Sequence, residues 1–328
     1  MLYNLFHLWK PDAICVSFDI PLQINIMRFM ERNKVTIPYI GIFPVEGDPL
    51  CMTWAMQMMG MQAQLCISQF GTNECNKVNV PAKHIQIGVD TVSWKIPSEL
   101  ERKTIRESMG IEPDEFVILC VADNQERKNL SRTLEIIKRF SEDKTKKFKF
   151  WLITREHFQQ GYELRDYCQE LDINNHVWIF ERGMPFKQLW SFFAGADCFL
   201  LSSKAEGLAL PVLEAMSVGL PVVATDCCAI REHLQDDRGY LIEPEYVMRD
   251  PWGNSRRYMA SVEDGAHLLN VVYSDWKLVM CPTRLRARKY AEARTWDIAV
   301  DTLDNTIKEV LNVQKKSQAI NDQTAILS

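Results

Sequence analysis

The sequence predicts an α/β protein built from two parallel sheets that are covered by helices. Short, continuous apolar runs recur along the chain, which is typical of strands buried on both faces. A segment of helical periodicity follows most of these runs, so strands and helices alternate. The chain has 328 residues, of which 47% are hydrophobic and 25% are charged, and this length is enough for two cores of moderate size. Two domains are therefore expected.

The N-terminal part, residues 1–95, is predicted to form the smaller α/β unit. Its expected strands are residues 13–18, 36–43, 64–68 and 84–88. The helix candidates INIMRFMER and MTWAMQMMG separate the first three strands. The second candidate is rich in methionine, which fits either a core helix or an exposed apolar face that contacts a membrane. The polar stretch at residues 90–103 is expected to link this unit to the rest of the chain.

The second part, residues 96–300, is predicted to be the larger domain. Its expected strands are residues 116–122, 148–154, 176–180, 197–201, 221–225 and 239–242. Between them lie the helix candidates NLSRTLEIIKRFSE, YELRDYCQEL, FKQLWSFFAG, PVLEAMSVG and AIREHLQ. This alternation predicts a doubly wound, Rossmann-like sheet.

The remaining C-terminal segments are expected to add little to that sheet. Residues 243–264 are rich in turn-forming residues and are predicted to be irregular. Residues 298–313 are strongly amphipathic, so residues 301–328 are expected to form a C-terminal helix and a frayed tail.

Charge and cysteine usage exclude several classes of protein. The net charge is -5 and no Lys/Arg stripe is present, which argues against nucleic acid as a partner. The ten cysteines are scattered without a C-x-x-C pair, as in a cytoplasmic protein with reduced thiols. The start of the chain does not resemble a signal peptide, and no window reaches the ~18 to 20 apolar residues of a membrane span. The expected location is cytoplasmic, at most peripheral to a membrane.

The segment AEGLALPVLEAM, residues 205–216, is the strongest candidate for a site. Glu206 and Gly207 follow an expected strand, Pro211 suits the first position of the next helix, and Glu214 would lie about one turn further. Ligands bind at the carboxyl ends of strands in open α/β sheets, and free N–H groups at a helix start bind anions such as a diphosphate. The alternative is that Glu214 complements the helix dipole and Glu206 is a solvated loop residue.

The string EGLALPVLEAM, followed by SVGLPVVAT, resembles the E-x7-E region of the family 4 glycosyltransferases. Similar strings bracket it: HIQIGVDTVSW, ADCFLLSS, ARTWDIAV and GIFPVEGDPL. The resemblance covers residues 11–312 and implies the GT-B fold, with two Rossmann-like domains and a truncated N-terminal one. It implies transfer of a sugar from a nucleotide-diphosphate donor with retention of configuration. No D-x-D pair occurs, so no metal is expected, and no cofactor besides the nucleotide-sugar co-substrate.

The resemblance also implies roles for individual residues. Glu214 is expected to hold the ribose hydroxyls, and Glu206 is expected beside the donor sugar. Lys128 and Arg127 are expected to neutralise the diphosphate leaving group. The other implied donor-binding positions are Gly207, Leu208, Ala209, Leu210, Ser203 and Thr225.

One position departs from the family pattern. Asp123 stands where the family has an arginine, so one phosphate-binding cation is missing unless Arg127, Arg155 or Lys204 replaces it.

The acceptor side is less complete. Asp19, Glu46 and Asp48 follow expected strands and are candidate acceptor residues or plain turn residues. The family's opening strand and glycine-rich loop have no counterpart, so a partner chain could complete the N-terminal domain. The acceptor is expected to be a glycan, a lipid-linked molecule or a protein. A non-catalytic sugar-nucleotide-binding subunit is the main alternative, and an epimerase or a phosphorylase is a weaker one.

Overall fold

The computed structural model describes residues 8–276 and 282–326, with side chains described as far as residue 313, and it divides into two compact units. Unit 1 comprises Met1–Gly88, Asp250–Ser255 and Thr295–Ser328, and unit 2 comprises Val89–Arg249 and Arg256–Arg294. This division differs from the expected boundaries at residues 95 and 300. The chain leaves unit 1 at Gly88, and its C-terminal helix belongs to unit 1.

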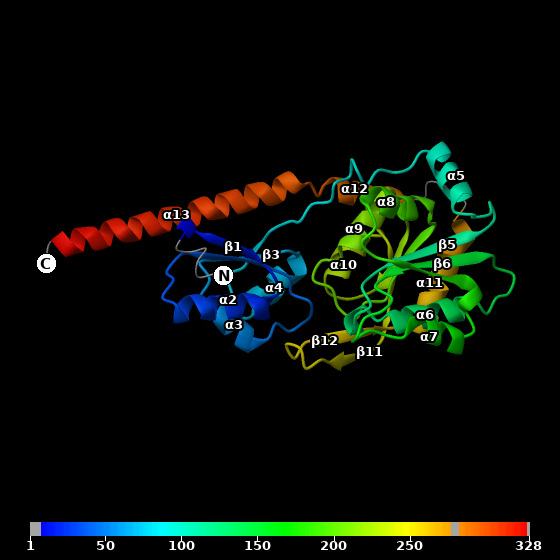
Figure 1. The fold of residues 1–328 in the computed structure, drawn as a ribbon, viewed down its shortest axis with the longest axis horizontal. Helices are drawn as coiled ribbons and strands as arrows, with labels where there is room; N and C mark the ends of the chain where they lie inside the picture. The colour runs from blue at the N-terminus through cyan, green and yellow to red at the C-terminus, as the bar shows by residue number, and fades with distance from the viewer. Residues whose placement is uncertain (1–7, 277–281, 327–328) are drawn as a thin grey trace. The chain divides into compact units, whose positions relative to one another are not determined.

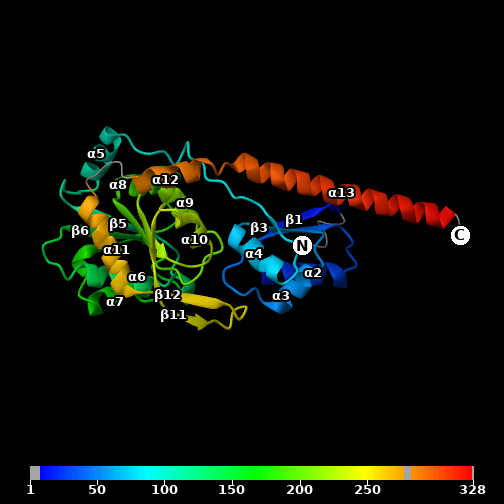
Figure 2. The same cartoon turned by 180° about the vertical axis from the view of Figure 1, so that it is seen from behind.

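Unit 1 contains a four-stranded parallel sheet in the order β1-β2-β3-β4. Its strands are β1 (Ile14–Ser17), β2 (Tyr39–Phe43), β3 (Ala63–Cys66) and β4 (Lys83–His84), and its helices are α2 (Ile20–Arg32), α3 (Met52–Met58), α4 (Gln69–Lys77) and α13 (Trp296–Ile326). Each strand pairs with the next one along the chain, so right-handed crossovers place α2, α3 and α4 on the same face. Figure 2 shows these three helices on one face and α13 on the other.

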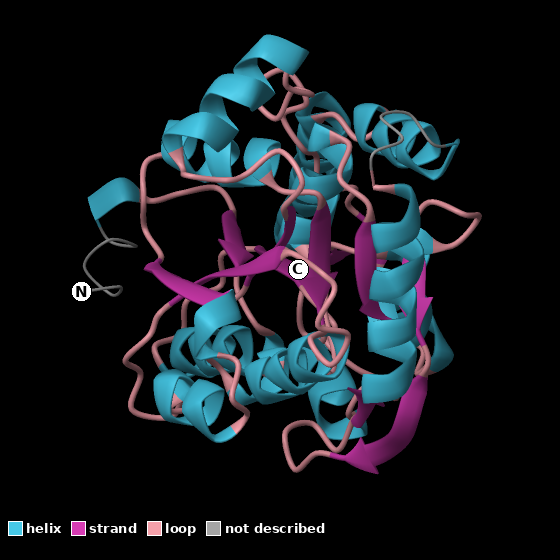
Figure 3. Cartoon of the chain, turned by 90° about the vertical axis from the view of Figure 1, so that its right-hand side faces the viewer, coloured by secondary structure: helices cyan, strands magenta, loops and turns pink. Residues whose placement is uncertain are grey.

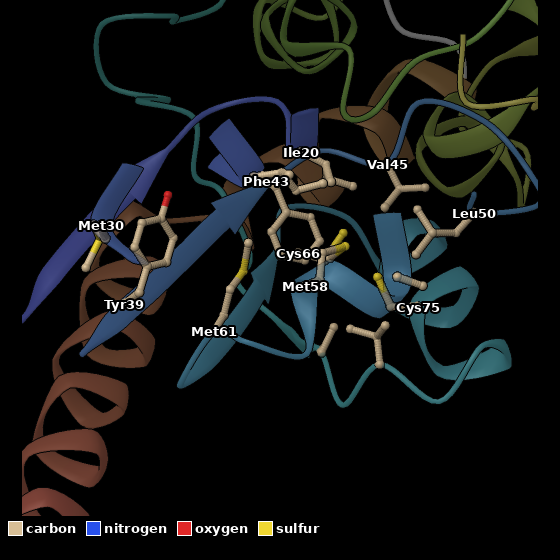
Figure 4. Close-up of a cluster of buried hydrophobic side chains, with 14 residues drawn as sticks. Ile20, Met30, Tyr39, Phe43, Val45, Leu50, Met58, Met61, Cys66 and Cys75 are labelled. Carbon is tan, nitrogen blue, oxygen red and sulfur yellow. The ribbon is translucent and has the colours of Figure 1, made fainter. Parts of the chain in front are cut away.

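An apolar cluster packs the helices against each face of this sheet. Phe43, Met58 and Cys66 belong to the cluster under α2, α3 and α4, and Figure 4 shows them close together. On the opposite face, Ala299 and Val310 of α13 pack with buried side chains of β2 and β3. This second cluster explains why the amphipathic C-terminal helix, expected to stand by itself, is part of unit 1: its apolar stripe is buried there. The helix continues to Ile326, through most of the expected frayed tail.

The structure confirms the four expected strands of unit 1, although β4 has only two residues. Helix α4 was not expected, because its sequence, QFGTNECNK, contains several poor helix formers. Ser68 caps this helix by accepting a hydrogen bond from the Gly71 N–H. Helix α3 combines the two alternatives given for its sequence, a core helix and an exposed apolar face. Ala55 and Met58 are buried, while Met52, Met56 and the following Met59 are exposed.

Unit 2 is built on a six-stranded parallel sheet in the order β10-β9-β8-β5-β6-β7. Its strands are β5 (Phe116–Val121), β6 (Phe148–Thr154), β7 (Val177–Glu181), β8 (Cys198–Leu201), β9 (Val222–Thr225) and β10 (Tyr240–Ile242). In chain order this is the doubly wound Rossmann arrangement, which confirms the expected fold class. β5 and β8 are neighbours in the sheet. The chain continues from β5 to β6 on one side of this pair and from β8 to β9 on the other, so the topological switch point lies between β5 and β8.

Helices cover both faces of this sheet, as Figures 1 and 3 show. Helices α6 and α11 contact each other on one face, and α8, α9 and α12 form a connected layer with α5 and α10 on the other. Their bounds are α5 (Glu99–Ser108), α6 (Leu130–Phe140), α7 (Leu164–Glu170), α8 (Phe186–Gly195), α9 (Leu210–Val218), α10 (Cys228–Leu234), α11 (Val262–Asp275) and α12 (Pro282–Glu292). Short 3-10 turns occupy Glu126–Lys128 and Asn174–His176.

One expectation for this region is wrong. Residues 243–264 were predicted to be irregular, but they contain the antiparallel hairpin of β11 (Pro244–Arg249) and β12 (Arg256–Ala260) and the start of α11. β11 is almost entirely exposed, so its sequence lacks the apolar alternation that would identify a strand. No disulfide joins the nine cysteines within the described ranges.

Candidate functional site

The candidate site lies at the carboxyl edge of the unit 2 sheet, beside the switch point. Lys128 lies in the loop that follows β5, and Glu206 lies in the loop that follows β8. Because β5 and β8 are adjacent and parallel, both loops leave the sheet at the same edge. In open α/β sheets this crevice is where ligands bind. The fold therefore brings together residues that are 78 positions apart.

Glu206 is the centre of a buried charge cluster. The Lys128 Nζ donates to its Oε1 at 2.6 Å, and the Arg127 Nη1 donates to its Oε2 at 3.0 Å. Glu206 is only 4% exposed. Burial raises the pKa of Glu206, but Lys128 and Arg127, with a contribution from the Ser203 hydroxyl, lower it to about 2. The carboxylate is therefore ionised at neutral pH. Its two cationic partners, Lys128 and Arg127, lie at the carboxyl edge of the sheet.

The loop between β8 and α9 carries a run of main-chain donors that have no acceptor in the described part of the chain. In the described part of the chain, the N–H groups of Gly207, Leu208, Ala209 and Leu210 have no acceptor. Ala209 is the N-cap of α9 and has a φ of 64° and a ψ of 60°, in the left-handed region. A left-handed residue before a helix start turns successive N–H groups outward, which makes an anion-binding surface.

The geometry of this turn differs from the expectation in one detail. Helix α9 begins at Leu210, so Pro211 occupies its second position and not its first. The left-handed residue of the turn is Ala209. Glu214 lies about one turn into α9, as expected.

Glu214 differs from Glu206 in having no cation beside it. Its side chain has no hydrogen-bond or ionic partner among the residues that the structure describes. Burial raises the pKa of Glu214 to about 7. The Thr225 hydroxyl, at the end of β9, is also buried and has no partner within the described ranges. Both groups are consequently available to a ligand that carries hydroxyl groups.

The helix α10 lies behind this loop and was not recognised from the sequence as part of the site. Its His233 contacts the Leu208 carbonyl oxygen through Nε2 at 2.6 Å. The Ala229 N–H donates to the Glu206 carbonyl oxygen at 3.2 Å. A lone histidine 25 positions from its partner leaves no local pattern, so only the tertiary structure identifies it.

The position that departs from the family pattern, Asp123, follows β5 and binds two arginines. Arg155, which follows β6, donates to it from Nε at 3.1 Å and from Nη2 at 2.5 Å. Arg182, which follows β7, lies 3.2 Å from the same carboxylate. The Lys204 ammonium is paired with Glu126. The structure thus places additional cations at this edge, but each of them has a carboxylate partner.

The candidate acceptor residues lie in unit 1, at the carboxyl ends of two neighbouring strands. Asp19 follows β1, is exposed and is the N-cap of α2 without a side-chain cap hydrogen bond. Glu46 and Asp48 are half-buried in the segment that follows β2. Because β1 and β2 are paired in parallel, these segments leave the sheet at one edge.

Within residues 8–276 and 282–313, whose side chains the structure describes, no group of three or more His, Cys, Asp or Glu side chains could hold a metal ion. None of the described helices combines the length and the apolar character needed to cross a bilayer.

Comparison with known proteins locates the family likeness in unit 2. The model of the family described as "Glycosyl transferases group 1" matches residues 101–249. The uncharacterized glycosyltransferase MJ1607 of Methanocaldococcus jannaschii is 24% identical over 248 residues, which cover 74% of this chain and 56% of that protein. The chain spans less than two thirds of the length of each of six curated relatives that it matches.

Solved structures extend the likeness over nearly the whole chain. Sucrose-phosphate synthase of Thermosynechococcus elongatus has a TM-score of 0.76 at 12% identity, covering 95% of this chain and 77% of that one. Anabaena HepE in complex with UDP and glucose has a TM-score of 0.70 at 15% identity, covering 94% of this chain and 81% of that one. Residues 101–249 therefore resemble a glycosyltransferase group 1 domain, and the chain has the GT-B fold.

Proposed function

We propose that this protein is a retaining glycosyltransferase of family 4 that transfers a sugar from a nucleotide-diphosphate donor without a metal ion. The observation that carries the proposal is the cluster of Glu206, Lys128 and Arg127 beside the free N–H groups of residues 207–210. This combination of fixed cations and main-chain donors suits a diphosphate. No further cofactor is proposed.

The chemical step places new negative charge on the departing diphosphate. The bond between the anomeric carbon and the phosphate oxygen breaks, and the electron pair stays on the diphosphate. The acceptor hydroxyl oxygen bonds to the same face of the sugar, and its proton passes to the departing phosphate oxygen. Lys128, Arg127 and the N–H groups of the loop stabilise that charge, because they are already oriented before the reaction. This arrangement supports leaving-group stabilisation by the protein alone.

The two glutamates take different parts in donor binding. Glu206 is ionised, and its oxygens can accept hydrogen bonds from donor-sugar hydroxyls when Lys128 and Arg127 turn towards the diphosphate. Glu214 has no cation to release, so its two oxygens are available to the paired ribose hydroxyls. Ser203 and Thr225 add hydroxyl groups at the same edge of the sheet.

We also propose that Asp19, Glu46 and Asp48 of unit 1, which follow neighbouring strands, bind the acceptor. A carboxylate there could orient the attacking hydroxyl of a glycan, a lipid-linked molecule or a protein. The N-terminal unit has four strands in the order of one half of a doubly wound sheet, which supports the proposal of a shortened domain.

The direct test is a panel of UDP-, GDP- and ADP-sugars with the wild-type chain and the Glu214→Ala variant. Transfer or donor hydrolysis is expected with one nucleotide, and loss of the ribose contacts should weaken donor affinity by about 10- to 100-fold. Glu170→Ala is the matched control, because Glu170 is exposed on α7 of the same unit. Activity should survive EDTA, and the product should keep the anomeric configuration of the donor by NMR.

Three results would count against parts of the proposal. An unaffected Glu214→Ala variant contradicts the ribose assignment, and an inverted product contradicts retention. Nucleoside diphosphate binding without transfer or hydrolysis of any sugar nucleotide favours the non-catalytic sugar-nucleotide-binding subunit.

A further inference from the structure

We propose that His233 is a positioning residue that orients the diphosphate-binding loop of residues 207–210. The inference rests on the proposed function and adds to it a residue outside the family-like motif. His233 touches no donor atom in this role. It acts by holding the Leu208 carbonyl group, and through it the N–H groups that face the phosphates.

The His233 imidazole is fully buried, with 0% exposure, and is held at both ring nitrogens. Its Nε2 lies 2.6 Å from the Leu208 carbonyl oxygen, which can only accept, so Nε2 carries a proton and donates. Its Nδ1 lies 3.1 Å from the Tyr290 hydroxyl of α12. The ring therefore connects the loop to a helix that packs on α9.

Tyr290, the partner of His233 on α12, is itself held by several contacts. The guanidinium groups of Arg238 and Arg294 both contact the Tyr290 ring, at 4.2 Å and 3.9 Å from its centroid. Its hydroxyl also lies 3.1 Å from the Glu232 carbonyl oxygen, so its single proton is donated either to that oxygen or to the His233 Nδ1. These two cation–π contacts help to hold the Tyr290 ring in place, and the ring in turn restrains the His233 imidazole that contacts its hydroxyl.

The hydrogen bond to Leu208 determines where the next N–H group points. In a trans peptide the C=O and N–H bonds point in opposite directions. Since the Leu208 carbonyl points to His233 on α10, the Ala209 N–H points away from α10. The Glu206 carbonyl is held by α10 in the same way, through the Ala229 N–H at 3.2 Å, so the Gly207 N–H is also turned outward.

The loop needs such a restraint because of its backbone conformation. Ala209 has a φ of 64°, which costs about 1–2 kcal/mol for a residue with a Cβ. Without the His233 contact, the Leu208–Ala209 peptide could relax, and the aligned N–H groups would be lost. A relaxed loop would still allow the fold, but it would bind phosphate less well.

The test compares the binding of a nucleoside with that of its diphosphate. His233→Asn keeps an amide near the Nδ1 position and loses the donor to Leu208, whereas His233→Gln places an amide N–H near Nε2. His233→Leu removes both polar groups. His267→Leu is the matched control, because His267 is an exposed histidine on α11 of the same unit. Calorimetry at 25 °C would measure UDP, GDP and ADP with their nucleosides, and circular dichroism would establish that each variant is folded.

The expected result is a selective loss for the diphosphates. His233→Asn and His233→Leu should bind the cognate nucleoside diphosphate about tenfold more weakly, which is the loss expected for about 1.4 kcal/mol. Their affinity for the cognate nucleoside should stay near the wild-type value, because Glu214 and not the loop holds the ribose. His233→Gln should restore diphosphate binding, and His267→Leu should change nothing.

One outcome would overturn the positioning role of His233 alone, and another would overturn the proposed function as well. If the wild-type chain binds the diphosphate and His233→Asn, folded, keeps the same ratio of diphosphate to nucleoside affinity, the positioning role is wrong and the proposed function stands. If the wild-type chain binds none of the three diphosphates, the proposed function fails, and the role of His233 fails with it.

Discussion

Glu214→Gln tests the electrostatics of the site without any assumption about substrate. The Glu214 carboxyl is largely buried, and no described cation compensates its charge. Its pKa is raised from 4.5 to about 7. Glutamine has nearly the same shape as the protonated acid but does not titrate, so the substitution removes the pH dependence and leaves the packing unchanged.

The magnitude follows from the size of the pKa shift. Each pH unit corresponds to about 1.36 kcal/mol, so the ionised form of Glu214 is disfavoured by about 3 kcal/mol in the native chain. Between pH 4.5 and about 7 the native chain keeps a proton that the unfolded chain has released. The free energy of unfolding therefore falls as the pH rises through this window, by about 3 kcal/mol in total.

The assay is urea denaturation at pH 5, 6, 7 and 8 for the wild-type chain and Glu214→Gln. Other titrating groups cancel in the difference between the two free energies of unfolding. The wild-type minus Glu214→Gln difference should fall between pH 5 and pH 7 and level off towards pH 8. Glu170→Gln, at an exposed position on α7, should show no such trend. A wild-type minus Glu214→Gln difference that stays constant from pH 5 to pH 8 would refute the reasoning.

Three further predictions concern other parts of unit 2. Asp197→Asn should lower the free energy of unfolding by about 3 kcal/mol in urea, because this buried carboxylate binds two arginines; an unchanged midpoint would contradict it. Ala209→Gly should raise the thermal midpoint through about 0.5 kcal/mol of relieved strain, whereas Ala215→Gly, inside α9, should cost about 1 kcal/mol. Asp123→Asn removes a negative charge at the edge of the site, so the cognate diphosphate should bind about twofold more tightly in calorimetry, and added salt should abolish this gain. Weaker binding would argue that Asp123 positions Arg155.

The parts of the fold that could be predicted are those with a strong local signal. β6 occupies residues 148–154, as its run FKFWLIT predicts, because a strand buried on both faces is apolar at nearly every position. Helix α4 and the β11–β12 hairpin lack such a signal. The first contains poor helix formers, and the second is exposed along most of its length.

The candidate site divides in a similar way. The position of Glu206 after a strand and of Glu214 inside the next helix followed from the sequence, and both lie there. That Lys128 and Arg127 pair with Glu206, and that Asp123 pairs with Arg155, required the structure. These pairs join loops from different strands, and their geometry depends on strand order.

The sequence by itself determined the alternation of strands and helices and the edge of the sheet at which the polar groups gather, because periodicity and strand ends are local properties. Only the tertiary structure decided that α13 belongs to unit 1 and that His233 meets Leu208. The first depends on which sheet face remains open to an amphipathic helix. The second depends on the packing of α10 behind the loop. Contacts of this kind join residues far apart in the chain, so they leave no periodic trace in the sequence.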